Sequence, residues 1–525
     1  MSQDNLEKTD SRPVVLSVAG SDCSGMAGIQ MDTRVISALG AHAATAITAN
    51  TAQSQTVFHA NPLETPAFKQ QLDAALELDI AAIKTGVLCN AKQVQLLAYG
   101  IASRDVPLII DPVLTSTNGG NFCPVELVEE ITTVLIPLST IITPNLAEAE
   151  QLTGLRIESE KDIETAAEKL VEMGAKNVLV KGGHAQNPTY SQDYFRGQDR
   201  NFCLSSPRNN TENSRGTGCA LSSAIATALA QGNPIEDAVV IGKMAINQGL
   251  RNSYAVLTLS DSQSNVGPVS ITHFPNCQED LPILTDSYDV DFNQAAFPSC
   301  VHGHTDGSND KRPLGLYPCV DSADWIERLI PQGITTIQLR NKTLSGDALE
   351  QEVARSIAIA KQTDCRLFIN DHWELAIKHG AYGVHLGQED LDTADVSAIR
   401  NAGLRLGLSS HCHYEVARAH RYKPSYMACG PVYHTNTKQM PWIPHNLEGL
   451  SYWKDTLDYP LVGIGGITQE RVAGVAQTGV SGVSLITAIT LADDPDEATR
   501  QMIETIDRQP IDQAHIGQSD IRQAQ

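Results

Sequence analysis

The sequence predicts two α/β domains in one chain: a mainly parallel α/β sandwich over residues 13–275 and a (β/α)₈ barrel over residues 313–506. Short apolar runs alternate with helical patterns along both parts, which is typical of βαβ units and parallel sheets. In the second part eight such units follow one another, and eight is the number that closes a barrel. Residues 276–312 and 507–525 lack this periodicity, so we expect a hydrated linker and a frayed tail.

The composition excludes several classes of protein. A net charge of −23 argues against non-specific binding to nucleic acid or acidic membranes. The 11 cysteines form no C-x-x-C pair, so a zinc ribbon or thioredoxin motif is not expected. No apolar run approaches the roughly 18 residues of a membrane span, and residues 1–12 contain no apolar leader. We therefore expect a cytoplasmic protein with reduced thiols that acts on small molecules.

In the first part, polar side chains follow the predicted strands. These strands are 13–19, 43–49, 80–87, 106–111, 139–143 and 177–181, with helices between most of them, such as 66–78 and 162–173. Ligands of parallel sheets bind beyond the carboxyl ends of the strands. The polar residues at those ends are Asp22, Gln53, Asp111, Asn145, Glu148 and Lys181. Taken singly, Asp111 before Pro112 is also explained by a turn, and Glu148 by a solvated helix.

A glycine-rich motif precedes the helix predicted from Ala220 to Ala230. Gly216 and Gly218 bracket Thr217, and Cys219 falls in the first helical turn. The unpaired N–H groups of a first turn, together with the helix dipole, bind anions. The same position lowers the pKa of a thiol. The motif therefore suits phosphoryl transfer, although a structural turn with a buried cysteine explains the same residues.

The second part contains the eight predicted strands of the barrel. They are 314–320, 336–339, 366–369, 383–386, 405–408, 426–429, 461–464 and 482–485. The active site of such a barrel lies at the carboxyl ends of its strands. There, Asp371 and Asp390 follow neighbouring strands and form a hard-cation site suited to Mg²⁺. Arg340, Lys342 and Lys438 add positive charge, so the sequence predicts that a diphosphate binds here.

The loops after the last two strands of such barrels often bind a phosphate. Here they contain Gly463–Gly466 and Ile486–Thr487. The barrel is thus expected to bring a diphosphate and a monophosphate together, although a tight turn also explains the glycines. In the linker, Cys300, His302 and His304 are candidate metal ligands, but no fourth ligand is evident, and a tether is the preferred interpretation.

Five motifs of the first part resemble the hydroxymethylpyrimidine and phosphomethylpyrimidine kinases of the ribokinase-like superfamily. The motifs are Ala19-Gly-Ser-Asp22, Gly25-Met-Ala-Gly-Ile-Gln-Met-Asp32, Thr143-Pro-Asn-Leu-Ala-Glu-Ala149, Val180-Lys-Gly-Gly-His184 and Gly216-Thr-Gly-Cys219. Most members of the superfamily carry Asp where this chain carries Cys219, whereas the pyrimidine kinases carry Cys. The resemblance covers about residues 13–275.

The resemblance implies a role for each matching residue. Gly20, Asp32 and Gln53 would hold the aminopyrimidine, and Cys219 would take the proton of its hydroxyl group. Gly216, Thr217 and Gly218 would bind the transferred phosphoryl group. Asn145 and Glu148 would organise Mg²⁺ and the phosphates of ATP, assisted by Asp111 and Lys181.

The barrel resembles thiamine-phosphate synthase over almost all of residues 313–506. The shared motifs include Gln338-Leu-Arg-x-Lys342, Asn370-Asp371, His385-Leu-Gly-Gln-Glu-Asp390, Thr435-x-Thr-Lys438 and Gly463-Ile-Gly-Gly-Ile467. The resemblance implies that Mg²⁺ binds Asp371 and Asp390. The pyrimidine diphosphate would be held by Gln338, Leu339, Arg340, Asn341, Lys342, Asn370, Ser409 and Lys438. The thiazole phosphate would be held by Thr435, Asn436, Thr437, Gly466, Ile486 and Thr487; Ser is commoner than Thr at position 487.

Together the resemblances imply a bifunctional enzyme of thiamine synthesis. It would use ATP and Mg²⁺ to phosphorylate a hydroxymethylpyrimidine twice, and then couple the diphosphate to thiazole phosphate. A homo-oligomer formed through the kinase domain is also expected. Two alternatives remain open: a pyridoxal-type kinase in the first part, and a non-catalytic or tautomerase-like barrel in the second.

Overall fold

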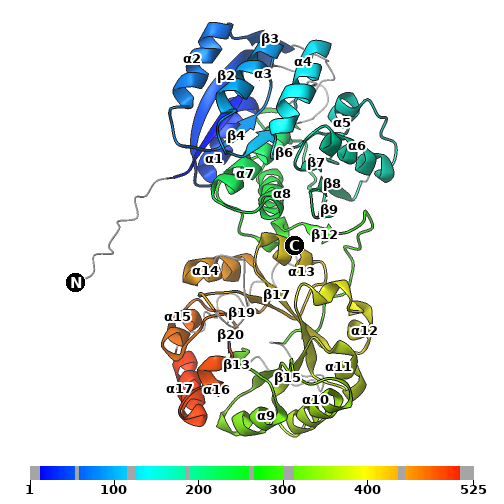
Figure 1. The fold of residues 1–525 in the computed structure, drawn as a ribbon, viewed down its shortest axis with the longest axis vertical. Coiled ribbons are helices and arrows are strands. Elements are labelled where there is room, and N and C mark those ends of the chain that lie inside the picture. The colour runs from blue at the N-terminus through cyan, green and yellow to red at the C-terminus, as the bar shows by residue number, and fades with distance from the viewer. Residues whose placement is uncertain are drawn as a thin grey trace, which may run out of the picture. The chain divides into compact units, whose positions relative to one another are not determined.

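The computed structural model describes residues 12–53, 58–114, 124–183, 188–258, 265–300, 313–435 and 444–508. The chain divides into two compact units, one of Met1–Pro275 with Glu279–Val290 and one of Asn276–Gln278 with Asp291–Gln525. Figure 1 labels their helices and strands. No helix in the described ranges combines the length and the apolar character needed to cross a membrane.

The first unit contains a sheet of ten strands in the order β12-β9-β8-β7-β6-β5-β4-β1-β2-β3. The strands β2, β1, β4, β5, β6 and β7 run parallel, and β3, β8, β9 and β12 are antiparallel to their neighbours. The strands are β1 Val14–Asp22, β2 His42–Gln53, β3 Phe58–Pro62, β4 Ile80–Thr85, β5 Leu108–Ile110, β6 Ile141–Ile142, β7 Val178–Val180, β8 Tyr190–Arg196, β9 Asn201–Pro207 and β12 Ile283–Thr285. The predicted α/β sandwich with a mainly parallel sheet is confirmed.

The helices of this unit are α1 Gly28–Ala38, α2 Thr65–Ala75, α3 Ala91–Ile101, α4 Val125–Glu130, α5 Leu146–Thr153, α6 Glu160–Glu172, α7 Thr217–Ala230 and α8 Ile235–Arg251. A small ribbon of β10 Leu257–Thr258 and β11 Asn265–Val266 lies outside the main sheet. Helix α7 packs against α1, α8 and β4, and nine of its residues are buried, including Ser222, Ser223 and Thr227. This burial fixes the first turn of α7 at the carboxyl ends of the central strands.

The region expected to be a hydrated linker is folded over residues 276–300, which corrects that expectation. Strand β12 pairs with β9 and covers what would be an open edge of the sheet. Tyr288 stacks on Tyr194 with ring centroids 5.8 Å apart. The sequence pattern is weak here because the strand has only three residues and owes its place to its partner. Residues 301–312, with His302 and His304, lie outside the described ranges.

The second unit is a closed parallel barrel of eight strands, β13 to β20 in sequence order, which confirms the predicted (β/α)₈ fold (Figure 1). The strands are β13 Gly315–Val320, β14 Thr336–Leu339, β15 Arg366–Asn370, β16 Gly383–Leu386, β17 Arg405–Ser410, β18 Tyr426–Cys429, β19 Leu461–Ile464 and β20 Gly482–Leu485. The helices are α9 Ala323–Leu329, α10 Gly346–Ala360, α11 Trp373–His379, α12 Val396–Asn401, α13 His413–His420, α14 Asn446–Thr456, α15 Val472–Gln477, α16 Thr487–Thr490 and α17 Pro495–Asp507.

The end of the expected linker packs onto the amino ends of the barrel strands. Arg366, the first residue of β15, donates to the carbonyl of Cys300 over 3.0 Å, and Arg405, the first residue of β17, donates to that of Ser299 over 3.4 Å. Phe297 is buried beneath the guanidinium of Arg400, which lies 4.3 Å from its ring centroid. Burial raises the pKa of Cys300 to about 12, so this thiol is protonated and packs as a core group.

Candidate active sites

The glycine motif of the first unit forms the amino terminus of α7. Gly216 has φ 80°, the left-handed region that favours glycine, and a Cβ at this position would clash with the carbonyl oxygen of Met26. No side chain caps the helix, so the first-turn N–H groups have no capping partner. The structure thus places these donors and the positive end of the helix dipole at one point, where an anion can bind.

Cys219 is surrounded by charge beneath this turn. Burial raises the pKa of its thiol to about 11; Lys84 opposes the rise, and Asp32 and Asp111 add to it. The expectation that the helix terminus lowers this pKa is therefore wrong for the ligand-free protein, since the cost of burying a thiolate outweighs the helix dipole. A backbone hydrogen bond from Gly28 favours the thiolate. Cys219 rests as a thiol with partners that would support its anion.

Asp32 is a buried residue of α1. Its carboxylate accepts from Lys84 Nζ at 2.9 Å to both oxygens, from Ser17 Oγ at 2.6 Å and from Ser223 Oγ at 2.9 Å. Neither Asp32 nor Lys84 has an exposed side chain. The contact of Asp32 with the pyrimidine stays a prediction.

Three predicted residues meet at the ends of β5, β6 and β7. Lys181 Nζ donates to Asp111 Oδ1 over 2.9 Å and lies 3.9 Å from Glu148 Oε2. Burial raises the pKa of Glu148; Lys181 opposes the rise, and Asp111 adds to it. Glu148 also forms a capping box with Asn145, whose backbone N–H donates to Glu148 Oε2 over 2.8 Å. The carboxylates of Asp111 and Glu148 are suitable ligands for a divalent cation, and its charge would reduce the repulsion between them.

This carboxylate cluster lies next to the glycine motif. A Cβ at Gly218 would stand 3.4 Å from Lys181 Nζ and 3.6 Å from Asp111 Oδ2. Ser222 Oγ on α7 also donates to Asp111, over 3.4 Å. The helix terminus and the carboxylate cluster are therefore two sides of one site, to which Thr217 belongs as the first residue of α7.

The other two residues predicted to hold the aminopyrimidine, Gly20 and Gln53, lie on β1 and β2. Gly20 is in β1, and the loop after it is held by Asp22, whose carboxylate accepts from the backbone N–H groups of Ser24, Met26 and Ala27 at 3.0–3.1 Å. Asp22 thus shapes the loop that packs on Gly216. Gln53 is the last residue of β2, and its side chain is outside the described part.

In the barrel, Asp371 and Asp390 form a carboxylate pair. Burial and the neighbouring Asp371 raise the pKa of Asp390, whose Oδ2 accepts from Gly387 N over 2.9 Å. Lys342 Nζ forms an ion pair with Asp371 Oδ2. Asp371 has φ 63°, a strained conformation of a kind that clusters at active sites. Such a pair fits Mg²⁺, and because no group of three protein ligands occurs among the described residues, water and a diphosphate would complete the coordination.

The residues predicted to bind the pyrimidine diphosphate lie in different surroundings. Arg340 lines a cavity of about 160 Å³ together with Asp321, Trp325, Ile486 and others. Leu339 is buried in the core, and Asn341 is engaged in its own loop, donating to Asp321 O and accepting from Thr343 N and Leu344 N. Gln338, Asn370 and Ser409 lie at the ends of β14, β15 and β17, with Gln338 and Asn370 buried.

The predicted thiazole-phosphate residues are described only in part. Gly466 has φ 64°, and a Cβ there would stand 2.5 Å from the carbonyl oxygen of His434, next to Thr435. Ile486 precedes α16, whose first residue is Thr487. Gly466 thus lets the loop after β19 approach the loop after β18. Asn436, Thr437 and Lys438 lie outside the described residues.

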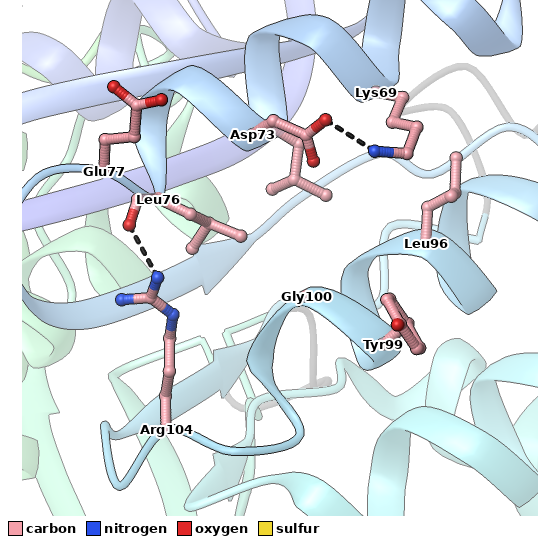
Figure 2. Close-up of a pocket in the computed structure, with 9 residues that line it drawn as sticks. Lys69, Asp73, Leu76, Glu77, Leu96, Tyr99, Gly100 and Arg104 are labelled. Atoms are coloured by element: carbon pink, nitrogen blue, oxygen red, sulfur yellow. Dashed lines mark hydrogen bonds and ion pairs between the residues drawn. The ribbon is translucent and has the colours of Figure 1, made fainter.

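Sequence reasoning missed several groups of both sites. Lys84 lies inside a predicted strand. A charged residue within an apolar run could have indicated that this lysine has a buried partner. The side chains of His385, Tyr317 and Tyr426 form hydrogen bonds inside the barrel. The sequence predicted the strands that carry these residues, but not the contacts between them. A further cavity of about 270 Å³ lies between α2 and α3 (Figure 2), where Lys69 pairs with Asp73 and Arg104 donates to Leu76 O. It is lined by none of the predicted site residues.

The fold and the sites define a two-domain transferase, with a phosphoryl-transfer site on a parallel sheet and a diphosphate site in a barrel. The sequence model of the family Phosphomethylpyrimidine kinase matches residues 22–263, and that of Thiamine monophosphate synthase matches residues 316–489. Thiamine-phosphate synthases of Yersinia pseudotuberculosis and Serratia proteamaculans are 54% identical over 195 residues, which are 37% of this chain and 91% and 92% of theirs. The chain belongs to the thiamine-phosphate synthase family through its barrel and carries a phosphomethylpyrimidine kinase domain, so it is a bifunctional thiamine biosynthesis enzyme with kinase and synthase activities.

Two solved structures are similar to the first unit. A phosphomethylpyrimidine kinase from Clostridium difficile is 33% identical, with a TM-score of 0.40, over 45% of this chain and 98% of that one. A pyridoxal kinase from Staphylococcus aureus in complex with AMP-PCP is 28% identical, with a TM-score of 0.47, over 50% of this chain and 95% of that one.

Proposed function

We propose that the first unit transfers phosphate from ATP to 4-amino-5-hydroxymethyl-2-methylpyrimidine and then to its monophosphate. The second unit would couple the resulting diphosphate to 4-methyl-5-(2-phosphoethyl)thiazole, in its carboxylated form, and release pyrophosphate and carbon dioxide. One observation carries the assignment: each unit gathers two carboxylates and a lysine at the carboxyl ends of its parallel strands. These groups are Asp111, Glu148 and Lys181 in the first unit and Asp371, Asp390 and Lys342 in the second.

In the kinase site, Cys219 accepts the proton of the substrate hydroxyl group, or of the phosphate in the second transfer. The N–H groups of residues 217–219 neutralise the transferred phosphoryl group, and Lys181 neutralises the ATP phosphates. Mg²⁺, held by Asp111 and Glu148 with Asn145 nearby, would supply charge neutralisation of the phosphates when bound. Gly20, Asp32 and Gln53 hold the pyrimidine.

In the barrel, Arg340, Lys342 and Lys438 stabilise the negative charge of the departing pyrophosphate. Asp371 and Asp390 would hold Mg²⁺, which neutralises the same charge when bound. Gln338, Asn370 and Ser409 position the pyrimidine, while Thr435, Asn436, Thr437, Gly466, Ile486 and Thr487 hold the thiazole phosphate. No protein nucleophile is needed, because departure of pyrophosphate leaves a pyrimidine methylene cation that the aminopyrimidine stabilises and the thiazole nitrogen captures. Catalysis comes from positioning and electrostatic stabilisation.

The test is to incubate the full chain with the pyrimidine alcohol, ATP, Mg²⁺ and thiazole phosphate and to analyse the products by mass spectrometry. We expect pyrimidine monophosphate, diphosphate and thiamine phosphate. A parallel reaction with pyridoxal separates the kinase alternatives, since a faster turnover of pyridoxal would contradict the proposal. Failure to couple a supplied pyrimidine diphosphate would instead support a non-catalytic barrel.

The proposal includes a cytoplasmic location and a homo-oligomeric state. The relation to enzymes of thiamine biosynthesis supports a cytoplasmic location, which fractionation of cells would test. The resemblance of the first unit to the pyrimidine kinases supports a homo-oligomer formed through that unit. Sedimentation of the full chain measures the oligomeric state, and a monomer at micromolar concentration would contradict it.

A further inference from the structure

A chain of hydrogen bonds crosses the interior of the barrel between two predicted pyrimidine-binding residues. Gln338 Nε2 donates to Tyr317 OH over 3.3 Å, and Tyr317 OH lies 2.8 Å from Tyr426 OH. Tyr426 OH lies 2.7 Å from His385 Nδ1, and His385 Nε2 lies 2.8 Å from Ser409 Oγ. The two tyrosines and the histidine are buried, whereas Ser409 is half-buried at the end of β17.

The hydrogen-bond chain requires a neutral His385. An imidazolium would donate from both ring nitrogens, and the proton of Tyr317 or of Tyr426 would then be buried without an acceptor. A neutral imidazole carries one N–H donor and one acceptor nitrogen, so the two contacts of its ring run in opposite senses. Either Nδ1 accepts from Tyr426 and Nε2 donates to Ser409, or both directions are reversed.

The amide of Gln338 decides between the two directions. Because the amide nitrogen only donates, the oxygen of Tyr317 accepts from Gln338, and the proton of Tyr317 needs an acceptor. Tyr426 OH is the acceptor that the described residues offer. Tyr426 then donates to His385 Nδ1, and His385 Nε2–H donates to Ser409 Oγ. In the reverse direction Tyr317 would accept from both Gln338 and Tyr426, and its own buried proton would be left without a partner, which is costly.

We propose that His385 is a positioning residue that makes Ser409 a hydrogen-bond donor towards the pyrimidine diphosphate. This rests on the proposed synthase function. With Nε2–H directed at Ser409 Oγ, the serine proton points away from the histidine and is free for a ligand. The site then selects a ligand atom that accepts a hydrogen bond, such as an unprotonated ring nitrogen or a phosphate oxygen. It disfavours a ligand that presents an N–H or O–H group at that position, because two donors would face each other.

The direct test is the ¹⁵N NMR spectrum of the histidines in the ligand-free full chain at neutral pH, in which protonated and unprotonated ring nitrogens resonate far apart. His385 is assigned as the signal that disappears in His385→Gln or shifts in Ser409→Ala, so one folded variant suffices. We expect an unprotonated Nδ1 and a protonated Nε2. The opposite tautomer, or an imidazolium, would overturn the proposal whether or not the chain makes thiamine phosphate.

A kinetic test separates this role from simple packing. The amide nitrogen of Gln can replace Nε2–H as donor to Ser409, whereas Asn is too short and can replace only Nδ1 as acceptor for Tyr426. We expect His385→Asn to raise KM for the pyrimidine diphosphate about tenfold and His385→Gln to raise it much less, about two- to threefold. In a Ser409→Ala background the two variants should give the same KM.

Equal effects of Gln and Asn, or a difference that persists without the Ser409 hydroxyl group, would contradict a role through Ser409. The source of the accepting atom is resolved with a substrate analogue in which a pyrimidine ring nitrogen is replaced by CH. If that nitrogen is the acceptor, Ser409→Ala should not weaken binding of the analogue further. If Ser409→Ala still does so, the acceptor is a phosphate oxygen. Unmodified chain that couples no pyrimidine diphosphate would contradict the proposed function alone.

Discussion

Lys84 and Asp32 form an ion pair in the interior of the first unit, with Lys84 Nζ 2.9 Å from both carboxylate oxygens and neither side chain exposed. Burial lowers the pKa of Lys84, but Asp32 and other acidic neighbours raise it more, so it stays above the usual value. Both charges affect the pKa of Cys219, so the ion pair is part of the structure that supports the kinase site.

Removing one partner of this pair should destabilise the first unit strongly. We expect Lys84→Met to lower its free energy of unfolding by about 3–5 kcal/mol, because Asp32 is left as an unpaired buried charge. Denaturant unfolding followed by a probe in the first unit measures this. The matched control is Lys69→Met, which breaks the exposed Lys69–Asp73 pair and should cost at most about 1 kcal/mol. Equal losses in the free energy of unfolding would contradict a larger contribution of the buried pair.

The two activities should be separable by single substitutions. Cys219→Ala should reduce kinase turnover by about 10²-fold or more, through loss of the acceptor for the substrate proton, and leave coupling of supplied diphosphate intact. Asp371→Ala should do the reverse, because it removes half of the carboxylate pair. Product analysis with each substrate set measures both. If either substitution in a folded protein abolishes both activities, the two-site interpretation is wrong.

The kinase activity should depend on pH through the ionisation of the Cys219 thiol. With a pKa of about 11, Cys219 is almost entirely protonated at neutral pH, and the thiolate fraction grows roughly tenfold per pH unit below that value. We expect kcat/KM for the pyrimidine alcohol to rise between about pH 7 and pH 9. Cys219→Asp should flatten this rise, since a carboxylate is ionised at lower pH. A flat profile in the unmodified enzyme would contradict a role of Cys219 as base.

The Mg²⁺ requirement of the synthase should increase as the pH falls. Burial and Asp371 raise the pKa of Asp390, so protons compete with the cation at higher pH than for an ordinary aspartate. The Mg²⁺ concentration for half-maximal coupling should therefore increase as the pH falls from neutral towards acid. Asp390→Asn should remove this pH dependence and raise the requirement throughout, whereas Asp392→Asn, at an exposed carboxylate nearby, should change neither. An unchanged requirement in the unmodified enzyme would count against the pair as ligands.

The folded end of the expected linker should stabilise the barrel. Phe297 is 4% exposed and packs under Arg400, so Phe297→Ala should lower the free energy of unfolding of the barrel by about 3 kcal/mol. Leu491→Ala, at a position 78% exposed, is the control and should change it by less than about 0.5 kcal/mol. A neutral Phe297→Ala would mean that residues 291–300 are a dispensable tether.

Both architectures were predictable because the hydrophobic pattern of parallel strands is local and strong. Strands at 336–339, 383–386, 426–429, 461–464 and 482–485 were predicted with the bounds that the barrel shows. The antiparallel strands β3, β8, β9 and β12 were missed. They carry mixed or short patterns, and their pairing depends on neighbours far away in the sequence.

Periodicity and motif spacing are properties of the chain, so they predict the two folds, the glycine motif before α7 and the acidic and basic residues at the strand ends. The contacts of each side chain at those ends follow from the folded arrangement. In the folded protein Asp32 forms a buried ion pair with Lys84, and burial raises the pKa of Cys219. Hydrogen bonds through His385 and two tyrosines connect Ser409 with Gln338. The physical reason is that desolvation and hydrogen-bond direction depend on which groups surround an atom in space, and sequence spacing does not encode this.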